Sequence, residues 1–336
     1  MLRLISGFIL ALVLCLGCAK EEGTPTESGE AKAEKLRIAV IPKGTTHEFW
    51  KSIHAGAIKA SRELDVEVIW KGPLKEDDRE QQINVVQGFI ATGVDGIVLA
   101  PLDAAALVRP VRDATKAGIP VVLIDSGLEA EAGTDYVSFV ATDNYEGGAL
   151  GARRLGELLD GKGNVILLRY QEGSASTDKR ETGFLDTLKK EFPDINILSD
   201  NQYAGATTET GMQAAQRLLG QFSDIQGFYA PNESSTFGAL RALEEDGRAG
   251  KVKFVGFDSS EKLVDAMRAG EINGLTLQNP FKMGYLGVKT MVAHLKGEPV
   301  EPRIDTGVVM VTPDNMDDPE VKSVLLPDLS EYLEGE

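Results

Sequence analysis

Short apolar runs alternate with longer segments of helical periodicity from about residue 36 onward. The apolar runs lack polar alternation, which is typical of strands buried on both faces of a parallel sheet. In the first part of the chain the pattern predicts strands at residues 36–41, 66–70, 96–100, 119–124 and 136–140, and helices at 49–64, 79–92 and 104–117.

A second series of the same kind follows. It predicts strands at residues 165–168, 195–198, 227–230, 252–257 and 275–277, and helices near 145–159, 177–190, 208–220, 234–246 and 260–269. Because strands and helices alternate in both series, we expect two doubly wound α/β lobes, each built on a parallel sheet.

Two short motifs recur in the two series. Ala100-Pro101 and Ala230-Pro231 each end an apolar run, and Asp125-Ser126 and Asp258-Ser259 follow at nearly the same distance. The same order of these two motifs in both series favours a duplicated lobe. The alternative explanation is that similar residues recur wherever a helix follows a strand, because Asp and Ser are common at helix N-caps.

The first residues have the pattern of an export signal. Arg3 precedes an apolar run at residues 4–16, which is shorter than the roughly 20 residues that span a bilayer and is followed by the polar Lys20. We therefore expect residues 1–17 to be a signal peptide and the protein to be exported, to the periplasm or the outer cell surface.

The signal ends in Cys15-Leu16-Gly17-Cys18, which resembles a bacterial lipobox. The resemblance implies that Cys18 is lipidated and anchors the chain to a membrane, with residues 18–35 as a flexible tether. Cys15 departs from the usual Leu, Val or Ala, so simple secretion is the alternative. The tether lacks large apolar side chains and cannot form a core.

Charge and residue types exclude several classes of function. The formal net charge of −17 argues against binding nucleic acid, because a phosphate backbone requires a basic surface. Both cysteines precede the folded part, so disulfides and thiol sites are not expected there. The three histidines lack metal-ligand spacing, and we expect neither a metal nor a cofactor.

Ligands of open parallel sheets bind beyond the carboxyl ends of the strands, so the residues that follow each strand are the candidates. Carboxylates accept hydrogen bonds from vicinal hydroxyls, Arg and amides donate to oxygens, and aromatic faces cover the C–H faces of a sugar ring. An amine-bearing ligand would also suit the two aspartates. The candidates are His47, Phe49, Trp50, Asp125, Ser126, Arg180, Asn232, Asp258 and Gln278.

Over residues 36–315 the chain resembles the ribose-binding-protein-like family of periplasmic sugar-binding proteins, which has the type I binding-protein fold. LacI-type repressors share the order of motifs, but the DNA-reading helix-turn-helix that they carry is not expected here. The motifs are Phe49-Trp50, residues 118–122 leading to Asp125, Thr142-Asp143-Asn144 with Gly147-Gly148, Arg180 with Gly183-Phe184, Asn232-Glu233 with residues 238–240, residues 255–258, and Gln278 with Gly284.

The resemblance implies two lobes joined by a hinge of three crossings, near Thr142, Gln278 and Gly307. Residues 36–141 plus 279–306 would form the N-terminal lobe, and 142–278 plus 307–336 the C-terminal lobe. Phe49 and Trp50 would sandwich a sugar ring from two lobe edges or from one face, and the polar candidates would bind its hydroxyls. Phe49 and Trp50 could instead be core residues, and Arg180 a solvated charge.

The resemblance also implies a monomer that delivers a sugar or polyol to the permease of an ABC importer. A sensor that docks to a chemoreceptor or sensor kinase is an alternative. An exported glycoside hydrolase using Asp125 and Asp258 is a further one.

Three positions depart from the ribose pattern, which has Asn at Ala100, Arg at Ser126 and an aromatic residue at Ala206. Smaller side chains there predict an enlarged pocket with fewer donors, and a ligand that is a larger or differently substituted sugar than ribose, or another polyol.

Overall fold

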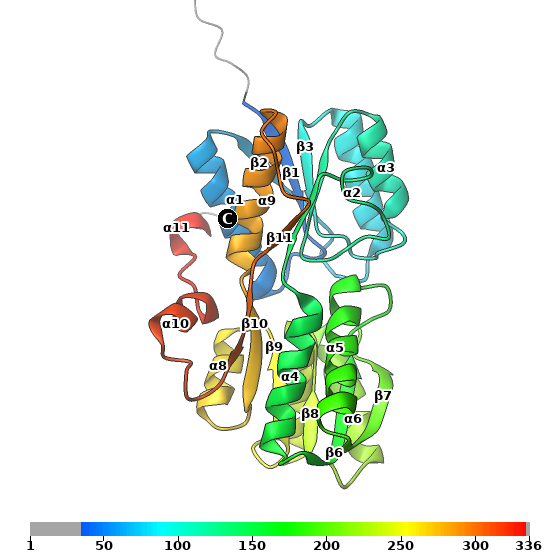
Figure 1. Cartoon of the computed structure of the whole chain (residues 1–336), viewed down its shortest axis with the longest axis vertical. Helices are drawn as coiled ribbons and strands as arrows, with labels where there is room; N and C mark the ends of the chain where they lie inside the picture. The colour runs from blue at the N-terminus through cyan, green and yellow to red at the C-terminus, as the bar shows by residue number, and fades with distance from the viewer. Residues whose placement is uncertain (1–34, 334–336) are drawn as a thin grey trace, which may run out of the picture. The chain divides into compact units, whose positions relative to one another are not determined.

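The computed structural model describes residues 35–333. The predicted signal peptide (1–17), Cys18 and almost all of the tether therefore lie outside the described residues. The described chain forms two α/β lobes, each with one six-stranded sheet covered by helices on both faces (Figure 1). This is the doubly wound arrangement that the alternation of apolar runs and helices predicted.

The N-terminal lobe contains a sheet in the order β11-β5-β4-β3-β1-β2, in which every pairing is parallel. Helices α1 and α9 pack on one face of this sheet, and α2 and α3 on the other. The elements are β1 (Arg37–Ile41), α1 (Glu48–Leu64), β2 (Glu67–Trp70), α2 (Arg79–Thr92), β3 (Gly96–Leu99), α3 (Val108–Lys116), β4 (Val121–Ile124), β5 (Ser138–Ala141), α9 (Pro280–Leu295) and β11 (Arg303–Asp305).

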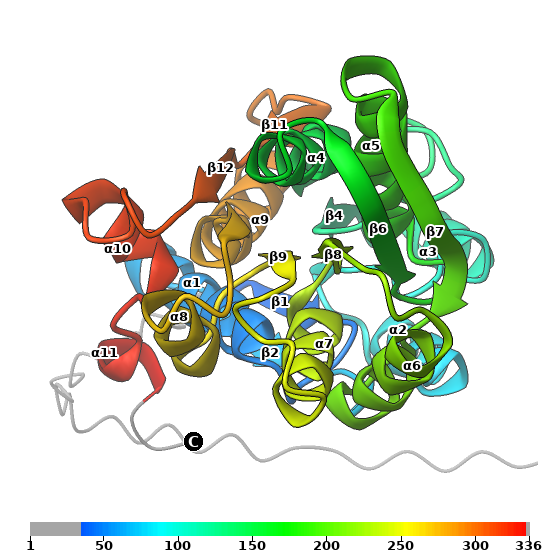
Figure 2. The same cartoon turned by 90° about the horizontal axis from the view of Figure 1, so that it is seen from below.

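The C-terminal lobe has a sheet in the order β12-β10-β9-β8-β6-β7, parallel except for β12, which pairs with β10 antiparallel. Helices α4 and α5 cover one face, and α6, α7, α8 and α10 cover the other (Figure 2). The elements are α4 (Asn144–Leu158), β6 (Lys162–Arg169), α5 (Ala175–Glu191), β7 (Asp194–Tyr203), α6 (Thr208–Gln221), β8 (Gly227–Tyr229), α7 (Glu233–Glu245), β9 (Lys253–Phe257), α8 (Glu261–Arg268), β10 (Gly274–Gln278), β12 (Val308–Val311) and α10 (Pro319–Leu325).

The two lobes share one strand topology. The order β2-β1-β3-β4-β5 in the first sheet corresponds position by position to β7-β6-β8-β9-β10 in the second. Asp125 follows β4 and Asp258 follows the equivalent β9, and both have left-handed backbones, with φ of 61° and 66°. Such φ values are uncommon outside glycine, and Asp tolerates them better than most residues. The recurring motifs therefore occupy equivalent turns.

The chain passes between the lobes from β5 to α4, from β10 to α9 and from β11 to β12. The first and third crossings lie side by side, because Thr142 Oγ1 lies 3.3 Å from Thr306 Oγ1 and 3.2 Å from the carbonyl oxygen of Gly307. These short segments connect two separately packed cores, which is the construction of a hinge.

The C-terminal segment departs from the expected boundary, which placed residues 307–336 wholly on the C-terminal lobe. Helix α10 packs on the core of that lobe through Leu325, but α11 (Ser330–Leu333) lies on the N-terminal lobe (Figure 1). There the Tyr332 ring lies 5.4 Å from the Phe281 ring, and Arg62 Nη1 donates to the carbonyl oxygen of Glu331. The segment thus bridges both lobes.

The sequence pattern did not assign α9, β11, β12, α10 or α11, and it started α3 too early. Residues 104–107 form a turn because Asp103 Oδ1 accepts hydrogen bonds from the backbone N–H groups of Ala105 and Ala106. The N–H of Ala104 instead donates to the carbonyl oxygen of Gly173 in the other lobe. The turn is therefore formed by Asp103 within its own lobe and also contacts the other lobe through Ala104.

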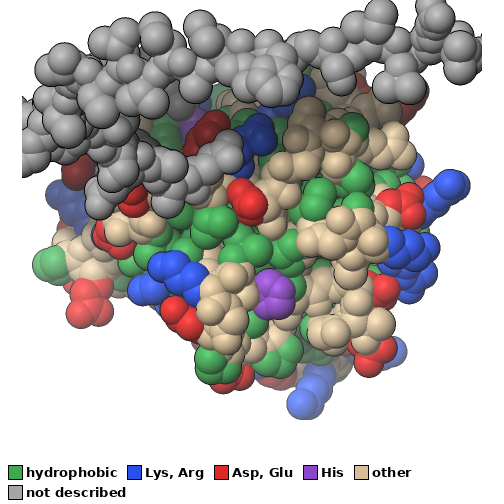
Figure 3. All heavy atoms as spheres, turned by 90° about the horizontal axis from the view of Figure 1, so that it is seen from above, with side chains coloured by type: hydrophobic (Ala, Val, Ile, Leu, Met, Phe, Trp, Pro, Cys, Tyr) green, Lys and Arg blue, Asp and Glu red, His purple; other side chains and the backbone are tan. Residues whose placement is uncertain are grey.

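None of the helices in the described chain is both long and apolar enough to cross a membrane. On the face in Figure 3, Lys and Arg side chains lie among Asp and Glu side chains and do not form a broad basic surface on the described residues.

Candidate functional site

A small cavity between the lobes, here called the inner cavity, is lined by residues from both sheets. Its volume is about 30 Å³, room for one or two waters. The carboxyl ends of the strands face it, as the fold requires. It brings together eight sequence candidates, namely His47, Phe49, Trp50, Asp125, Arg180, Asn232, Asp258 and Gln278.

The ninth candidate, Ser126, does not line the inner cavity. It is fully buried, and its Oγ accepts a hydrogen bond from the backbone N–H of Ser176 at 3.1 Å. Ser176 lies in the first turn of α5, so Ser126 ties the N-terminal lobe to a helix of the C-terminal lobe.

Lys43 is a lining residue that the sequence analysis did not select. Its Nζ lies 3.0 Å from Asp125 Oδ2 and donates to Ser174 Oγ at 3.3 Å and to Ser176 Oγ at 3.0 Å across the lobes. Lys43 is the second residue after β1, so inspection of the first two positions after every strand would have found it. Its ammonium neutralises the charge of Asp125.

Glu76 is a second lining residue that the sequence did not reveal, because it lies in the loop between β2 and α2 without a motif. Its Oε1 lies 2.6 Å from His47 Nδ1 and accepts a hydrogen bond from Trp50 Nε1 at 2.7 Å. Its Oε2 accepts from the Tyr170 hydroxyl of the other lobe at 2.8 Å. One carboxylate therefore organises three ring side chains.

The His47–Glu76 pair is ionised at neutral pH. Burial alone would lower the pKa of His47, but the hydrogen bond to Glu76 and the neighbouring carboxylates raise it to about 9. Burial would raise the pKa of Glu76, whereas its hydrogen bond with His47 and the attraction of His47 and Lys43 lower it to about 2.

Arg180 is a buried cleft residue and not a solvated helix charge, since its exposed fraction is 2%. Its Nε donates to Asn144 Oδ1 at 2.8 Å and its Nη1 to the carbonyl oxygen of Pro231 at 2.9 Å. The guanidinium lies 3.9 Å from the centre of the Phe257 ring. Its Nη2 has no hydrogen-bond partner among the described residues, so one donor is free for a ligand.

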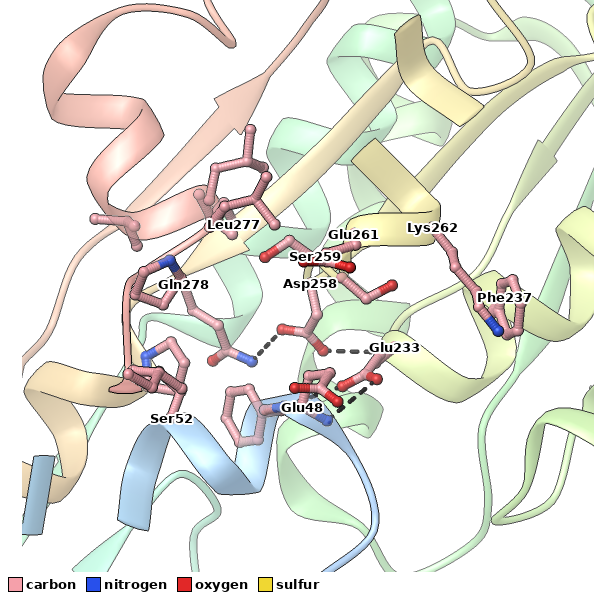
Figure 4. Close-up of a pocket in the computed structure, with 18 of the residues that line it drawn as sticks. Glu48, Ser52, Glu233, Phe237, Asp258, Ser259, Glu261, Lys262, Leu277 and Gln278 are labelled. Carbon is pink, nitrogen blue, oxygen red and sulfur yellow. Dashed lines mark hydrogen bonds between the residues drawn. The ribbon is translucent and has the colours of Figure 1, made fainter. Parts of the chain in front are cut away.

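Asp258 is held by hydrogen bonds from two neighbours (Figure 4). Gln278 Nε2 donates to its Oδ1 at 2.7 Å, and the backbone N–H of Glu233 donates to its Oδ2 at 3.1 Å. Burial raises the pKa of Asp258 despite the attraction of Arg180. Gln278 Oε1 has no hydrogen-bond partner within residues 35–333.

Glu233 caps a helix of the opposite lobe. Its two carboxylate oxygens accept hydrogen bonds from the backbone N–H groups of Glu48 and Phe49, in the first turn of α1. His47, at the N-cap position of α1, makes no side-chain cap. Burial raises the pKa of Glu233 to about 7, although the positive charge of His47 opposes the shift.

Asn232 combines a cavity position with a capping role. It is the N-cap of α7, where its Oδ1 accepts from the backbone N–H of Ser235 at 3.3 Å and its Nδ2 donates to Ser234 Oγ at 3.1 Å. The preference for Asn at N-caps explains why it occupies this position.

Phe49 and Trp50 line the inner cavity and also belong to the core of the N-terminal lobe. Their rings meet edge to face, with centres 4.9 Å apart. Both lie on α1, so they do not flank the cavity from two lobes.

The expected enlargement of the pocket does not occur in the inner cavity. Neither Ala100 nor Ala206 lines it. Lys43, Glu76 and Tyr170 occupy the space between the lobes instead, and their long side chains reduce the volume.

The charges around the inner cavity compensate one another. Lys43, protonated His47 and Arg180 face Glu76, Asp125 and Asp258, with Glu233 close to its titration point at neutral pH. No group of acidic, His and Cys side chains in the described chain could hold a metal ion.

A family model described as a periplasmic binding protein domain matches residues 38–299. The chain is 30% identical over 322 residues to a D-ribose/D-allose-binding protein of Pseudomonas aeruginosa, covering 93% of this chain and 99% of the relative. It is 29% identical over 307 residues to the D-allose-binding periplasmic protein of Escherichia coli, covering 90% and 93%.

Solved structures show the same fold. A carbohydrate transporter solute-binding protein from Agrobacterium radiobacter, in complex with D-arabinose, has a TM-score of 0.84 at 34% identity, covering 88% of this chain and all of that one. An ABC transporter solute-binding protein from Agrobacterium vitis, bound with α-D-tagatopyranose, has a TM-score of 0.83 at 30% identity, with the same coverage of 88% and 100%.

Proposed function

Because the chain belongs to the periplasmic binding protein family, we propose that it captures a neutral sugar or sugar-like polyol between its lobes and delivers it to the permease of an ABC importer. The observation that carries this proposal is the inner cavity, where Asp125 of one lobe and Arg180 and Asp258 of the other face a common space. A ligand that contacts both lobes favours their closure.

Polar groups that meet across the cleft can be replaced by hydroxyls of a ligand. Tyr170 donates to Glu76, and Lys43 donates to Ser174 and Ser176, all between lobes. A sugar hydroxyl both donates and accepts, so it can take the place of either partner in each bond. Arg180 Nη2 and Gln278 Oε1 supply a further donor and acceptor.

The compensated charges favour a neutral ligand. Asp125 is paired with Lys43, and Asp258 accepts two hydrogen bonds and lies 3.9 Å from Arg180 Nη1. An amine would have to displace these partners, and a net charge buried without compensation is costly. A neutral hydroxylated ligand leaves the balance of charges around the inner cavity unchanged.

The family relatives are named for ribose and allose, and the structural neighbours hold arabinose and tagatose. These names support a monosaccharide-like ring as the bound group. Export through residues 1–17 and lipid anchoring at Cys18 belong to the same proposal, since a permease partner requires the protein outside the cytoplasm.

Binding without turnover is part of this function. The carboxylates of Asp125 and Asp258 are each engaged by a fixed partner, whereas a glycosidase needs one acid to protonate a leaving group and another to attack or to activate water. Incubation of the protein with aryl glycosides should release no aglycone; steady release would point to a hydrolase.

A thermal-shift screen of the purified chain against neutral sugars, polyols, sugar acids and amines tests the proposal. A ligand that binds only the native state raises the melting temperature by mass action. We expect the largest shift from a neutral sugar or polyol. The proposal fails if only amines or acids produce a shift.

A further inference from the structure

A much larger space, here called the side chamber, adjoins the inner cavity. Its volume is about 670 Å³, within the range of about 300–1,000 Å³ usual for small-molecule sites. Phe49, Glu233, Asp258 and Gln278 line both spaces, so the two spaces are neighbours that share these side chains. Figure 4 shows the lining of the side chamber, with Asp258 and Gln278 among the labelled residues.

The bridging C-terminal segment forms the outer wall of the side chamber. Residues 324–329 line it, between α10 on the C-terminal lobe and α11 on the N-terminal lobe. Leu325 is buried in the core and Tyr332 packs on Phe281, so both ends of this wall are fixed. The side chamber thus has walls of ordered structure from both lobes.

Two buried oxygen atoms in the side chamber have no hydrogen-bond partner within the described chain. They are Ser52 Oγ, in a residue that is 4% exposed, and Gln278 Oε1, in a residue that is 2% exposed. Leaving such atoms unsatisfied costs about 1–3 kcal/mol each. Gln278 lines both spaces, whereas Ser52 lines only the side chamber, so the Ser52 hydroxyl is the atom reserved for a group bound there.

The remaining lining suits a neutral sugar ring. Phe49, Phe237 and Leu277 offer apolar surfaces for the C–H faces of a ring, and Ser259 adds a hydroxyl. Glu48, Glu233, Asp258, Glu261 and Asp328 outnumber the single cation of the lining, Lys262, which disfavours a sugar acid or a phosphate.

We propose that the side chamber is a second sugar subsite, so that the preferred ligand is a disaccharide or a glycoside whose first ring enters the inner cavity. This inference rests on the proposed sugar-binding function. To bind the first ring in the inner cavity, the lobes must exchange their direct hydrogen bonds for contacts with the ligand. The second ring fills the side chamber, which is already formed.

Isothermal titration calorimetry of the full chain with matched sugars tests the proposal. The panel pairs D-glucose with maltose and cellobiose, D-galactose with lactose and melibiose, and D-ribose and D-allose with their methyl glycosides. We expect at least one larger member to bind about tenfold or more tightly than its monosaccharide, a difference of about 1.4 kcal/mol.

Two substitutions test the location of the second ring. Ser259→Trp fills the side chamber and should weaken the larger ligand about tenfold while leaving the monosaccharide unchanged, because Ser259 does not line the inner cavity. Ser52→Ala removes only a hydroxyl and should weaken the larger ligand about threefold to tenfold. Ser223→Trp, at an exposed position away from the side chamber, is the control and should change neither affinity.

The outcomes separate the two proposals. Monosaccharides that bind as tightly as every larger sugar overturn the second subsite and leave the sugar-binding function intact. Equal effects of Ser259→Trp on both ligand sizes, with Ser52→Ala silent, also overturn it. If no sugar of either size binds, the sugar-binding function itself fails, and the second subsite with it.

Discussion

The carboxylate of Glu233 accepts a hydrogen bond from the backbone N–H of Phe49 at 3.1 Å, although the two residues belong to opposite lobes. The first turn of α1 has free N–H groups that its own N-cap side chain does not satisfy. The C-terminal lobe supplies the missing acceptor through Glu233. The contact between the lobes therefore completes a helix cap.

Ligand affinity should fall as the pH rises from about 5 to 8. Burial raises the pKa of Glu233, which lies against the opposite lobe, to about 7, so the closed state holds a proton that the open state releases earlier. The stability of the closed state is complete at low pH and decreases as Glu233 deprotonates. Calorimetry across this range measures the effect.

Glu233→Gln should flatten the lower part of that profile, between pH 5 and 7. The amide keeps one hydrogen-bond acceptor for α1 but cannot titrate. Affinity at pH 5 should therefore fall by less than about tenfold, which is the loss expected if the helix cap were removed completely. A profile as steep as that of the unmodified protein would rule out Glu233 as the titrating group.

Glu76→Gln should lower the stability of the protein by about 3 kcal/mol, because it leaves His47 buried without its partner. The pKa of His47 should fall below its ordinary value of 6.5, since burial then dominates. The pair stabilises the native state fully between about pH 4.5 and 6.5, and that stability is lost as the pH falls through about 2 or rises through about 9. Melting temperatures and the NMR titration of His47 measure both effects; an unchanged pKa would contradict the pairing.

Asp258→Asn should weaken sugar binding about 10- to 100-fold, since the variant loses charged acceptors for Gln278 and Glu233 N–H and for any ligand hydroxyl. Asp265→Asn, at an exposed acid on α8, is the matched control and should bind normally. Normal binding by Asp258→Asn, measured by calorimetry, would remove Asp258 from the site.

Tyr332→Ala should accelerate ligand release about threefold to tenfold, because it removes the contacts of α11 with Phe281 and Arg62 that tie the C-terminal segment to the N-terminal lobe. Stopped-flow displacement measures the rate. Tyr203→Ala, at an exposed tyrosine on β7, is the control. An equal acceleration in both variants would show that the bridge plays no part in closure.

Gly148→Ala should destabilise the protein by about 3 kcal/mol, since an added Cβ would lie 1.8 Å from the carbonyl oxygen of Arg180 where α4 meets α5. Gly88→Ala, on the exposed side of α2 with open space around it, should stabilise by about 0.5–1 kcal/mol. Chemical denaturation measures both, and equal effects would contradict the close packing of α4 on α5.

The sequence by itself determined the α/β alternation of both lobes and the positions at which their strands end. Apolar runs without polar alternation must be buried on both faces, and parallel strands bring their carboxyl ends to one edge. Asp125 and Asp258 could therefore be placed at the carboxyl edges of their sheets from local pattern alone, whereas a cleft shared by the two lobes was implied by the family resemblance. Their role in ligand binding, like the signal peptide and Cys18, stays a prediction.

Only the tertiary structure decided which side chains meet across the cleft. The bond between Tyr170 and Glu76 joins residues 94 apart, and that between Phe49 and Glu233 joins residues 184 apart. Local hydrophobic patterns report burial within one lobe, whereas these contacts depend on how two separately packed lobes are placed. For the same reason the sequence pattern did not predict the bridging C-terminal segment, whose two short helices pack on different lobes.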